Sequence, residues 1–230
     1  MNILALDTST EGCSAALVMG TSISERFVIA PRDHSLLILP MLDALLVEAG
    51  IGLTQIDAVA FGCGPGSFTS VRIAAGIAQG IAYGADLPVI AVSSLAALAQ
   101  SANTKTGARR VLAAIDARMG EVYWGAYECD SAGLMSLRET EGVYTPRLVP
   151  FPEGKEWFGA GSGWKTYGAV LHEHLQHLLQ RYESEHYPRA RDVARLGEKY
   201  FNQGLAVSAE HAMPVYLRNE VAWKKSAKSG

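Results

Sequence analysis

A strand, a glycine turn and a helix follow one another between residues 56 and 84, and this succession constrains the fold more than any other stretch. Residues 57–61 have the apolar filling of a buried strand, which the glycine-rich run 62–66 breaks sharply. Residues 71–83 are small or good helix formers and include no proline. We therefore predict a buried strand that turns directly into a helix, with the rest of the chain arranged around this unit.

A glycine turn that leads into a helix has two interpretations. Free N–H groups and the helix dipole at the N-terminus can bind an anion, which makes Gly64 and Gly66 candidate phosphate-binding residues. The turn can equally need glycine only for its backbone conformation. No lysine follows Gly66, and the glycine spacing does not fit the dinucleotide fingerprint, so neither a P-loop nor a dinucleotide-binding motif is present.

Gly76, Gly80 and Gly84 are four residues apart in the expected helix, so they lie on one face of it. Each glycine makes a helix less stable than alanine would, by about 1 kcal/mol. We therefore expect another backbone or a phosphate to come close to this face.

The Asp-Thr-Ser run at residues 7–9 is a second candidate site. Residues 2–6, 13–19 and 23–29 predict a three-stranded meander, and Asp7 lies where the first strand leaves the sheet. A carboxylate there can reach a metal-bound phosphate while the Thr8 and Ser9 hydroxyls bond its oxygens. Asp, Thr and Ser also turn chains with no ligand present, so both interpretations stay open.

The segment 34–50 predicts a helix that is more apolar than a surface helix needs to be. Pro40 is expected to kink it or to mark a boundary. Either the helix is fully internal, or it presents a second face to another polypeptide. Combined with the glycine face, the second alternative predicts an interface formed by Leu36, Leu39, Leu42, Leu45, Leu46, Arg72, Ala75, Gly76 and Gly80.

Composition sets the outer bounds. With 230 residues and 49% hydrophobic content, the chain can bury a full core as one large or two small domains. A formal net charge of −3 gives no electrostatic reason to bind nucleic acid or an anionic membrane. The three cysteines are far apart and lack a C-x-x-C, so we expect neither disulfides nor structural zinc. The apolar run 3–6 is too short for a signal peptide or membrane span, and we expect a cytoplasmic protein.

The opening pattern returns in the second part of the chain. Residues 111–116 echo residues 3–7, so that Asp116 takes the place of Asp7, and residues 158–163 echo the glycine turn 61–66. The polar stretch 103–107, which follows an expected strand at 88–92 and helix at 93–100, predicts a linker. We therefore predict two related halves, residues 1–104 and 105–230, the second without a counterpart of the Leu-rich helix.

The second half is expected to carry a helix at 165–182, an extended segment at 143–151 and a helix at 191–202 that packs back on the first half. His174 and His177 could share a face of the 165–182 helix, where we expect solvated histidines rather than metal ligands. Residues 215–218 predict a last extended piece, and residues 224–230 a solvated tail. The signatures G-x-S-x-G and H-E-x-x-H do not occur.

Two halves, each with a strand meander, an aspartate and a glycine turn before a helix, resemble the superfamily of actin, sugar kinases and heat-shock chaperone ATPases. This resemblance implies an α/β fold of two actin-like halves with mixed sheets flanked by helices. More closely, LDTS at residues 6–9, GCGPGSFTSVR at 62–72 and PVYLR at 214–218 resemble the TsaB family, once called YeaZ, over nearly the whole chain.

The resemblance implies a bacterial subunit of the machinery that places threonylcarbamoyl on the adenosine 3′ of the tRNA anticodon. Its implied partners are the catalytic paralogue TsaD, bound as a heterodimer through the first-half helices, and the ATPase TsaE, with tRNA contacted only indirectly. Without TsaD, the same helices are expected to form a homodimer. In TsaD the equivalent of Ser94 and Leu98 is a metal-binding His-x-x-x-His pair, so this chain is expected to have no metal site and no catalytic residues.

Three functions remain open, of which the first is favoured. The first is a non-catalytic scaffold, for which a charged residue at Leu45 or Ala75 should abolish the TsaD complex and leave the monomer folded. The second is an actin-like enzyme that binds and hydrolyses ATP between its halves, and the third is a peptidase acting on TsaD. No cofactor is expected to be tightly bound, and ATP or ADP could lie at a subunit interface. The candidate nucleotide-binding residues are Asp7, Thr8, Ser9, Gly64, Gly66 and Asp116.

Overall fold

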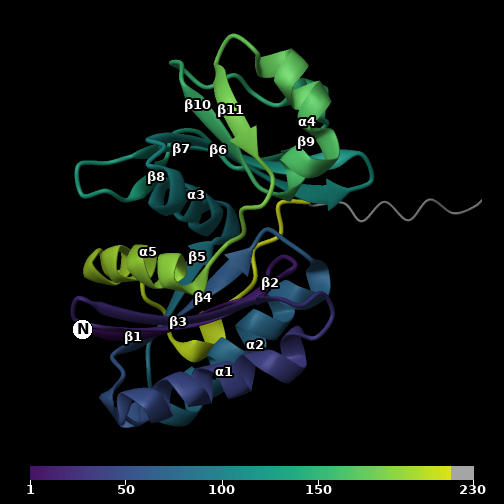
Figure 1. The fold of residues 1–230 in the computed structure, drawn as a ribbon. Coiled ribbons are helices and arrows are strands. Elements are labelled where there is room, and N and C mark those ends of the chain that lie inside the picture. Colours follow the sequence, from purple (N-terminus) through teal and green to yellow (C-terminus); the bar gives the residue numbers. More distant parts are fainter. Residues whose placement is uncertain (219–230) are drawn as a thin grey trace, which may run out of the picture.

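The structure, a computed structural model, describes residues 1–218, drawn as a ribbon in Figure 1. The tail expected at 224–230 lies outside the described residues. None of the helices among residues 1–218 is long and apolar enough to cross a membrane.

The first half is built on a five-stranded sheet with the order β3-β2-β1-β4-β5. β1 to β3 form the expected antiparallel meander, and β4 and β5 run parallel to β1 because the chain crosses over through helices. The strands are β1 (Asn2–Asp7), β2 (Gly12–Met19), β3 (Ser22–Ile29), β4 (Ala58–Gly64) and β5 (Val89–Ser93). The helices are α1 (His34–Ala49), η1 (Leu53–Gln55), α2 (Phe68–Ala85) and α3 (Ser94–Thr106).

The second half is built on a six-stranded sheet with the order β11-β10-β6-β7-β8, in which β9 also pairs with β7. Residues 130–156 hold short strands and a 3₁₀ turn where the first half has α1. The strands are β6 (Arg110–Arg118), β7 (Glu121–Cys129), β8 (Met135–Leu137), β9 (Gly142–Tyr144), β10 (Trp157–Ala160) and β11 (Leu179–Glu183). The remaining helices are η2 (Pro146–Leu148), α4 (Ser162–Leu175), α5 (Ala190–Asn202) and η3 (Ala209–His211).

The internal repeat is confirmed by strand pairing and by the glycine turns. β1 pairs antiparallel with β2 and parallel with β4, just as β6 pairs antiparallel with β7 and parallel with β10. Gly64 and Gly161, which occupy matching places in the two turns, have φ angles of 109° and 107°. Only glycine adopts such angles readily, which explains why the same letters recur. The chain therefore has the expected fold of two actin-like halves.

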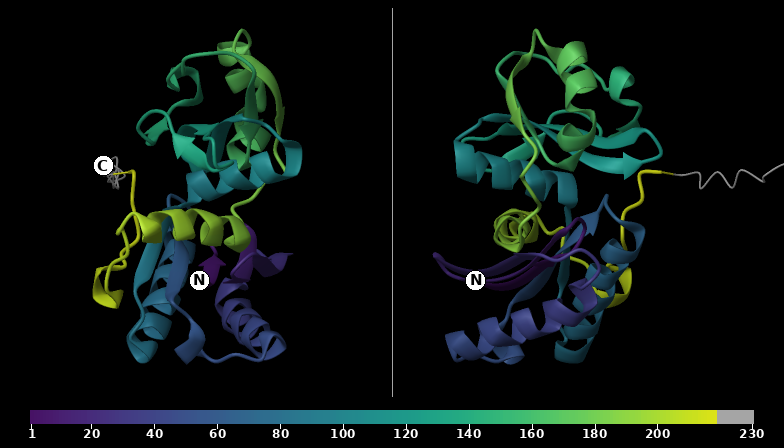
Figure 2. Two further views of the ribbon diagram at one scale, coloured as in Figure 1. Left: turned by 90° about the vertical axis from the view of Figure 1, so that its left-hand side faces the viewer. Right: turned by 45° about the vertical axis from the view of Figure 1, so that its right-hand side comes forward.

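Helices and sheets alternate as layers (Figures 1 and 2). Alternate residues of β1 point to opposite faces of the first sheet: Leu4 and Leu6 pack with α1 and α2, whereas Ile3 and Ala5 pack with α3 and α5. α3 also packs on the second sheet, α5 packs on α3, and α4 covers the far face of the second sheet. The central core therefore joins the two halves, and α1 and α2 form one outer layer of the molecule.

Two expectations about elements were wrong, and Pro40 does not mark a helix boundary. Residues 103–106 are the last turn of α3, closed by Gly107 at φ 75°, so the polar stretch is a helix end rather than a linker, and the boundary expected at residue 104 falls within a helix. α1 continues through Pro40, which lies on the exposed side of the helix, where water can satisfy the carbonyl that loses its partner. The helix expected at 165–182 ends at Leu175, and Leu179–Glu183 pairs with β10 as β11.

After β11 the chain returns to the first half. α5 packs on β1, β2, β4 and β5, and it is anchored by Arg189, whose Nη2 lies 2.6 Å from Oε2 of Glu25. Residues 204–218, here called the C-terminal strap, then run along the first half, where Val207 pairs with Val89 and η3 packs on α2. At its end, the Arg218 guanidinium bonds Glu121 and the Ala117 carbonyl in the second half.

Candidate functional site

Asp7 lies at the end of β1 and is completely buried. Its Oδ1 accepts hydrogen bonds from the Ser9 N–H and the Ser9 hydroxyl, both at 2.9 Å. Its Oδ2 has no hydrogen-bond partner among the described residues. Burial raises the pKa of the Asp7 carboxyl from 3.8 to about 6, and the two bonds from Ser9 oppose this shift without cancelling it.

The glycines of the first turn are required by the chain's own packing. A Cβ on Gly62 would lie 1.7 Å from Oδ2 of Asp7, and one on Gly66 would lie 2.3 Å from the Ser9 carbonyl oxygen. A Cβ on Gly64 would lie 2.7 Å from the carbonyl oxygen of Val215 in the C-terminal strap. The glycines therefore let the chain approach itself, which is the interpretation that requires no ligand.

The hydroxyl groups around this turn are also engaged. The Thr8 hydroxyl donates to the Ser70 carbonyl at 2.7 Å, and the Ser67 N–H donates to the Ser9 carbonyl at 2.9 Å. The Thr8 and Ser9 hydroxyls and the Ser67 N–H thus bond protein atoms in this structure. In this arrangement, Asp7, Thr8, Ser9, Gly64 and Gly66 contact other parts of the same chain.

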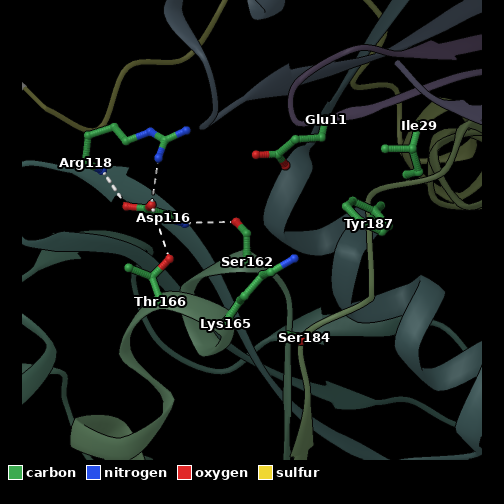
Figure 3. Close-up of a pocket in the computed structure, with 9 residues that line it drawn as sticks. All are labelled: Glu11, Ile29, Asp116, Arg118, Ser162, Lys165, Thr166, Ser184 and Tyr187. Atoms are coloured by element: carbon green, nitrogen blue, oxygen red, sulfur yellow. Dashed lines mark hydrogen bonds and ion pairs between the residues drawn. The ribbon is translucent and has the colours of Figure 1, made fainter. Parts of the chain in front are cut away.

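A pocket of about 300 Å³ lies between the two halves (Figure 3). Asp116 lines it, but its carboxylate already accepts bonds from the Arg118 N–H at 2.8 Å and the Thr166 hydroxyl at 3.4 Å. Asp7 and the first glycine turn do not line this pocket, so the structure does not bring the two aspartates of the repeat into one site. The lining residues are Glu11, Ile29, Asp116, Arg118, Ser162, Lys165, Thr166, Ser184 and Tyr187.

Ser94 and Leu98 correspond to the His-x-x-x-His pair of TsaD, and in this chain both side chains make packing or hydrogen-bond contacts within the core. The Ser94 hydroxyl accepts the Gly64 N–H at 3.2 Å, and a Cβ on Gly161 would lie 2.6 Å from Cδ2 of Leu98. Both side chains are completely buried. Within residues 1–218, no group of three His, Cys, Asp or Glu side chains is placed to bind a metal ion, and the three cysteines are free and buried.

Of the histidines of the second half, His172 and His177 are exposed as expected, whereas His174 is not. His177 lies beyond the end of α4, so it does not share a helical face with His174. Nε2 of His174 lies 3.0 Å from the Val149 carbonyl oxygen, and the Phe151 ring packs on the imidazole with centroids 4.3 Å apart. His174 is therefore a packed side chain rather than a solvated one.

The outer layer of α1 and α2 exposes large apolar side chains. Leu36 on α1 is 72% exposed and Tyr83 on α2 is 82% exposed, and Leu39 and Val47 are also exposed. Leu46 is half-buried, whereas Leu42, Leu45 and Ala75 are buried within the chain's own core. The last three therefore cannot belong to an exposed interface, which corrects the expectation that a charge at Leu45 or Ala75 would leave the monomer folded.

The glycine face of α2 is open to solvent. Apart from the helix's own backbone and the adjacent residues, no atom of residues 1–218 lies within 4 Å of a Cβ built on Gly76, Gly80 or Gly84. The fold would accept alanine at all three positions, in contrast to Gly62 and Gly66. We refer to Gly76, Gly80 and Gly84 as the glycine track.

Sequence reasoning missed part of this surface. Phe68, at the start of α2, and Met213 and Tyr216, from the C-terminal strap, are exposed beside the glycine track. The strap is held against α2 by the Tyr216 hydroxyl, which accepts from Nε of Arg72 at 2.8 Å, across 144 positions of sequence. The motifs GCGPGSFTSVR and PVYLR contain Phe68 and Tyr216, but the letters alone do not show that the two segments meet.

Comparison with known proteins places the chain in a family. The model of the family TsaD, tRNA N6-adenosine threonylcarbamoyltransferase, matches residues 28–226. The tRNA threonylcarbamoyladenosine biosynthesis protein TsaB of Escherichia coli strain K12 is 48% identical over 98% of both chains. The protein of the same name from Haemophilus influenzae is 42% identical over 98% of this chain and 97% of its own.

A solved structure agrees with these relatives. The structure described as YeaZ from Pseudomonas aeruginosa superimposes with a TM-score of 0.88 at 46% identity, and the match covers 94% of this chain and 99% of that one. Fold, repeat and sequence thus lead to one conclusion: the chain belongs to the TsaB group of the TsaD family.

Proposed function

We propose that this chain is a non-catalytic subunit required for threonylcarbamoyl modification of the adenosine 3′ of the tRNA anticodon. In this proposal it binds and supports a catalytic TsaD-type subunit through the outer face of α1 and α2, acts beside a TsaE-type ATPase and contacts tRNA only indirectly. Without the TsaD-type subunit, the same face forms a homodimer. The relatives are tRNA threonylcarbamoyladenosine biosynthesis proteins, which supports the pathway, and a tRNA substrate implies the cytoplasm.

The observation that carries the docking role is the glycine track beside exposed apolar side chains. Helices pack most closely where glycines remove side chains from the contact, because the backbones can then approach each other. Leu36, Leu39 and Tyr83 supply the apolar area around the track. An exposed apolar surface of this kind is typical of a protein–protein interface.

The proposal that the chain is non-catalytic rests on what its residues do. Ser94 and Leu98 are engaged in packing, and Asp7 is sealed against Gly62. We also propose that the chain alone holds no tightly bound nucleotide, and that ATP or ADP, where required, binds at an interface with another subunit. The saturated bonding of Thr8 and of Asp116 supports this proposal.

Gly80→Met tests the docking role. The new side chain would point into open space, so the isolated chain should fold with unchanged or higher stability. It should nevertheless weaken binding of the TsaD-type subunit by more than about tenfold, because the partner helix can no longer approach. Titration calorimetry measures the affinity, and His172→Met on the exposed side of α4 is the matched control. Wild-type affinity in Gly80→Met would overturn the proposal.

A further inference from the structure

The outer face of α2 carries one cation, and its surroundings fix its orientation. Arg72 is the only Lys or Arg within α1 and α2, and its side chain is exposed. Its guanidinium carbon lies 3.7 Å from the centroid of the Phe68 ring, and its Nε donates to the Tyr216 hydroxyl at 2.8 Å. Stacking on one side and a hydrogen bond at one edge hold the planar group in place.

The remaining edge of the guanidinium is unpaired among the described residues. Nη1 and Nη2 of Arg72 make no hydrogen bond or ion pair within residues 1–218. These two nitrogens form a fork that matches the two oxygens of a carboxylate. Phe68 and Tyr216, which are 57% and 43% exposed, flank the fork with apolar surface that can exclude water from such a pair.

The position of Arg72 relates this fork to the glycine track. Residues 68, 72, 76 and 80 are four apart in α2, so Phe68, Arg72, Gly76 and Gly80 follow one another along the same face. A helix that packs along Gly76 and Gly80 therefore reaches Arg72 about one turn further on. A single cation surrounded by apolar surface is suited to bind a single carboxylate. Binding of a nucleic-acid backbone requires several cations that contact successive phosphates.

We propose that Phe68, Arg72 and Tyr216 form a preorganised anchor that binds an Asp or Glu side chain of the TsaD-type subunit. This inference rests on the proposed docking role and adds its polar component: the glycine track sets how closely the helices approach, and the anchor sets their register. A side chain that is already immobilised loses little entropy on binding, so the anchor contributes more than a freely rotating arginine would.

A zero-length cross-link tests the anchor directly. In Arg72→Lys, a carbodiimide should join the introduced amine to the carboxylate that it contacts, and mass spectrometry of the purified complex should find position 72 linked to an Asp or Glu of the TsaD-type subunit. Arg195→Lys, an exposed position on α5, is the matched control and should give no such link. An assembled complex without a link from position 72 to the partner would overturn the anchor. A link only to Asp43, an exposed acid on α1 of a second copy of this chain, would overturn it as well.

The affinities of two variants for the TsaD-type subunit distinguish an error in the proposed anchor from an error in the proposed docking role. Arg72→Gln should weaken binding by about tenfold or more, and Tyr216→Phe by about threefold because it frees the guanidinium without removing it. Wild-type affinity in Arg72→Gln while Gly80→Met still blocks binding would overturn the anchor alone. Wild-type affinity in both variants would overturn the docking role as well.

Discussion

At the end of β1, the Asp7 carboxylate fills the space that a side chain at Gly62 would need. The sequence predicts that an aspartate stands where this strand leaves the sheet, and the structure agrees. The sequence does not show that Gly62 closes over the carboxylate, because the two residues meet only once β4 pairs with β1. An aspartate at a strand end therefore remains ambiguous between ligand binding and turn formation until its neighbours across the sheet are known.

Replacing Asp7 should change stability in a pH-dependent way. The pKa of this carboxyl is about 6 in the folded chain and 3.8 without burial, so above pH 4 the unfolded chain loses its proton first. The resulting cost to folding is absent below pH 3.8, grows with pH and is complete above pH 6. Asp7→Asn removes the titration, and its stability relative to wild type should rise by about 1.5 kcal/mol from pH 5 to pH 8.

Urea unfolding at both pH values measures this difference, with Asp43→Asn on the exposed side of α1 as the control for the substitution itself. The change between the two pH values is the informative quantity, because any packing effect of asparagine is common to both. A difference that stays constant or shrinks as pH rises would contradict a folded-state pKa raised by burial.

The apolar residues of α1 include both buried and exposed side chains, and its sequence does not tell them apart. Its sequence predicts a helix with more apolar surface than one buried face requires, and the structure divides that surface between the core, which takes Leu42 and Leu45, and solvent, which takes Leu36 and Leu39. The sequence did not separate the two sets, since apolar residues cover both faces and mark neither as outer. The shortened α4 has a similar cause, because pairing with β10 makes residues 179–183 a strand.

The stability of charged variants should distinguish the buried face of α1 from its exposed face. Leu45→Asp buries a carboxylate in the outer core of the first half and should destabilise the chain by more than about 3 kcal/mol, seen as loss of the cooperative unfolding transition. Leu36→Asp introduces the same charge on the exposed side, so it should leave stability within about 0.5 kcal/mol and weaken the TsaD-type complex. Equal stability of the two variants would contradict the assignment of the faces.

Several contacts among the described residues tie the two halves together. α3 and α5 share one core with both sheets, Arg189 ties the returning chain to Glu25, and Arg218 ties the C-terminal strap to Glu121. The repeat predicts the halves, but their union depends on contacts between segments far apart in sequence, such as Arg189 with Glu25. In the folded chain, α2 contacts α1 and also η3 of the strap, so segments far apart in sequence lie together in the outer layer.

Reconstituted tRNA modification, with the TsaD-type and TsaE-type subunits present, tests the central claim most directly. The claim is that this chain acts through the outer surface of α1 and α2 rather than through chemistry at Asp7. Adding wild-type chain or Asp7→Asn should restore threonylcarbamoyl transfer to tRNA, whereas Gly80→Met should leave it near the level without the chain. Full modification with Gly80→Met, or its loss with Asp7→Asn in a complex that still assembles, would contradict the account.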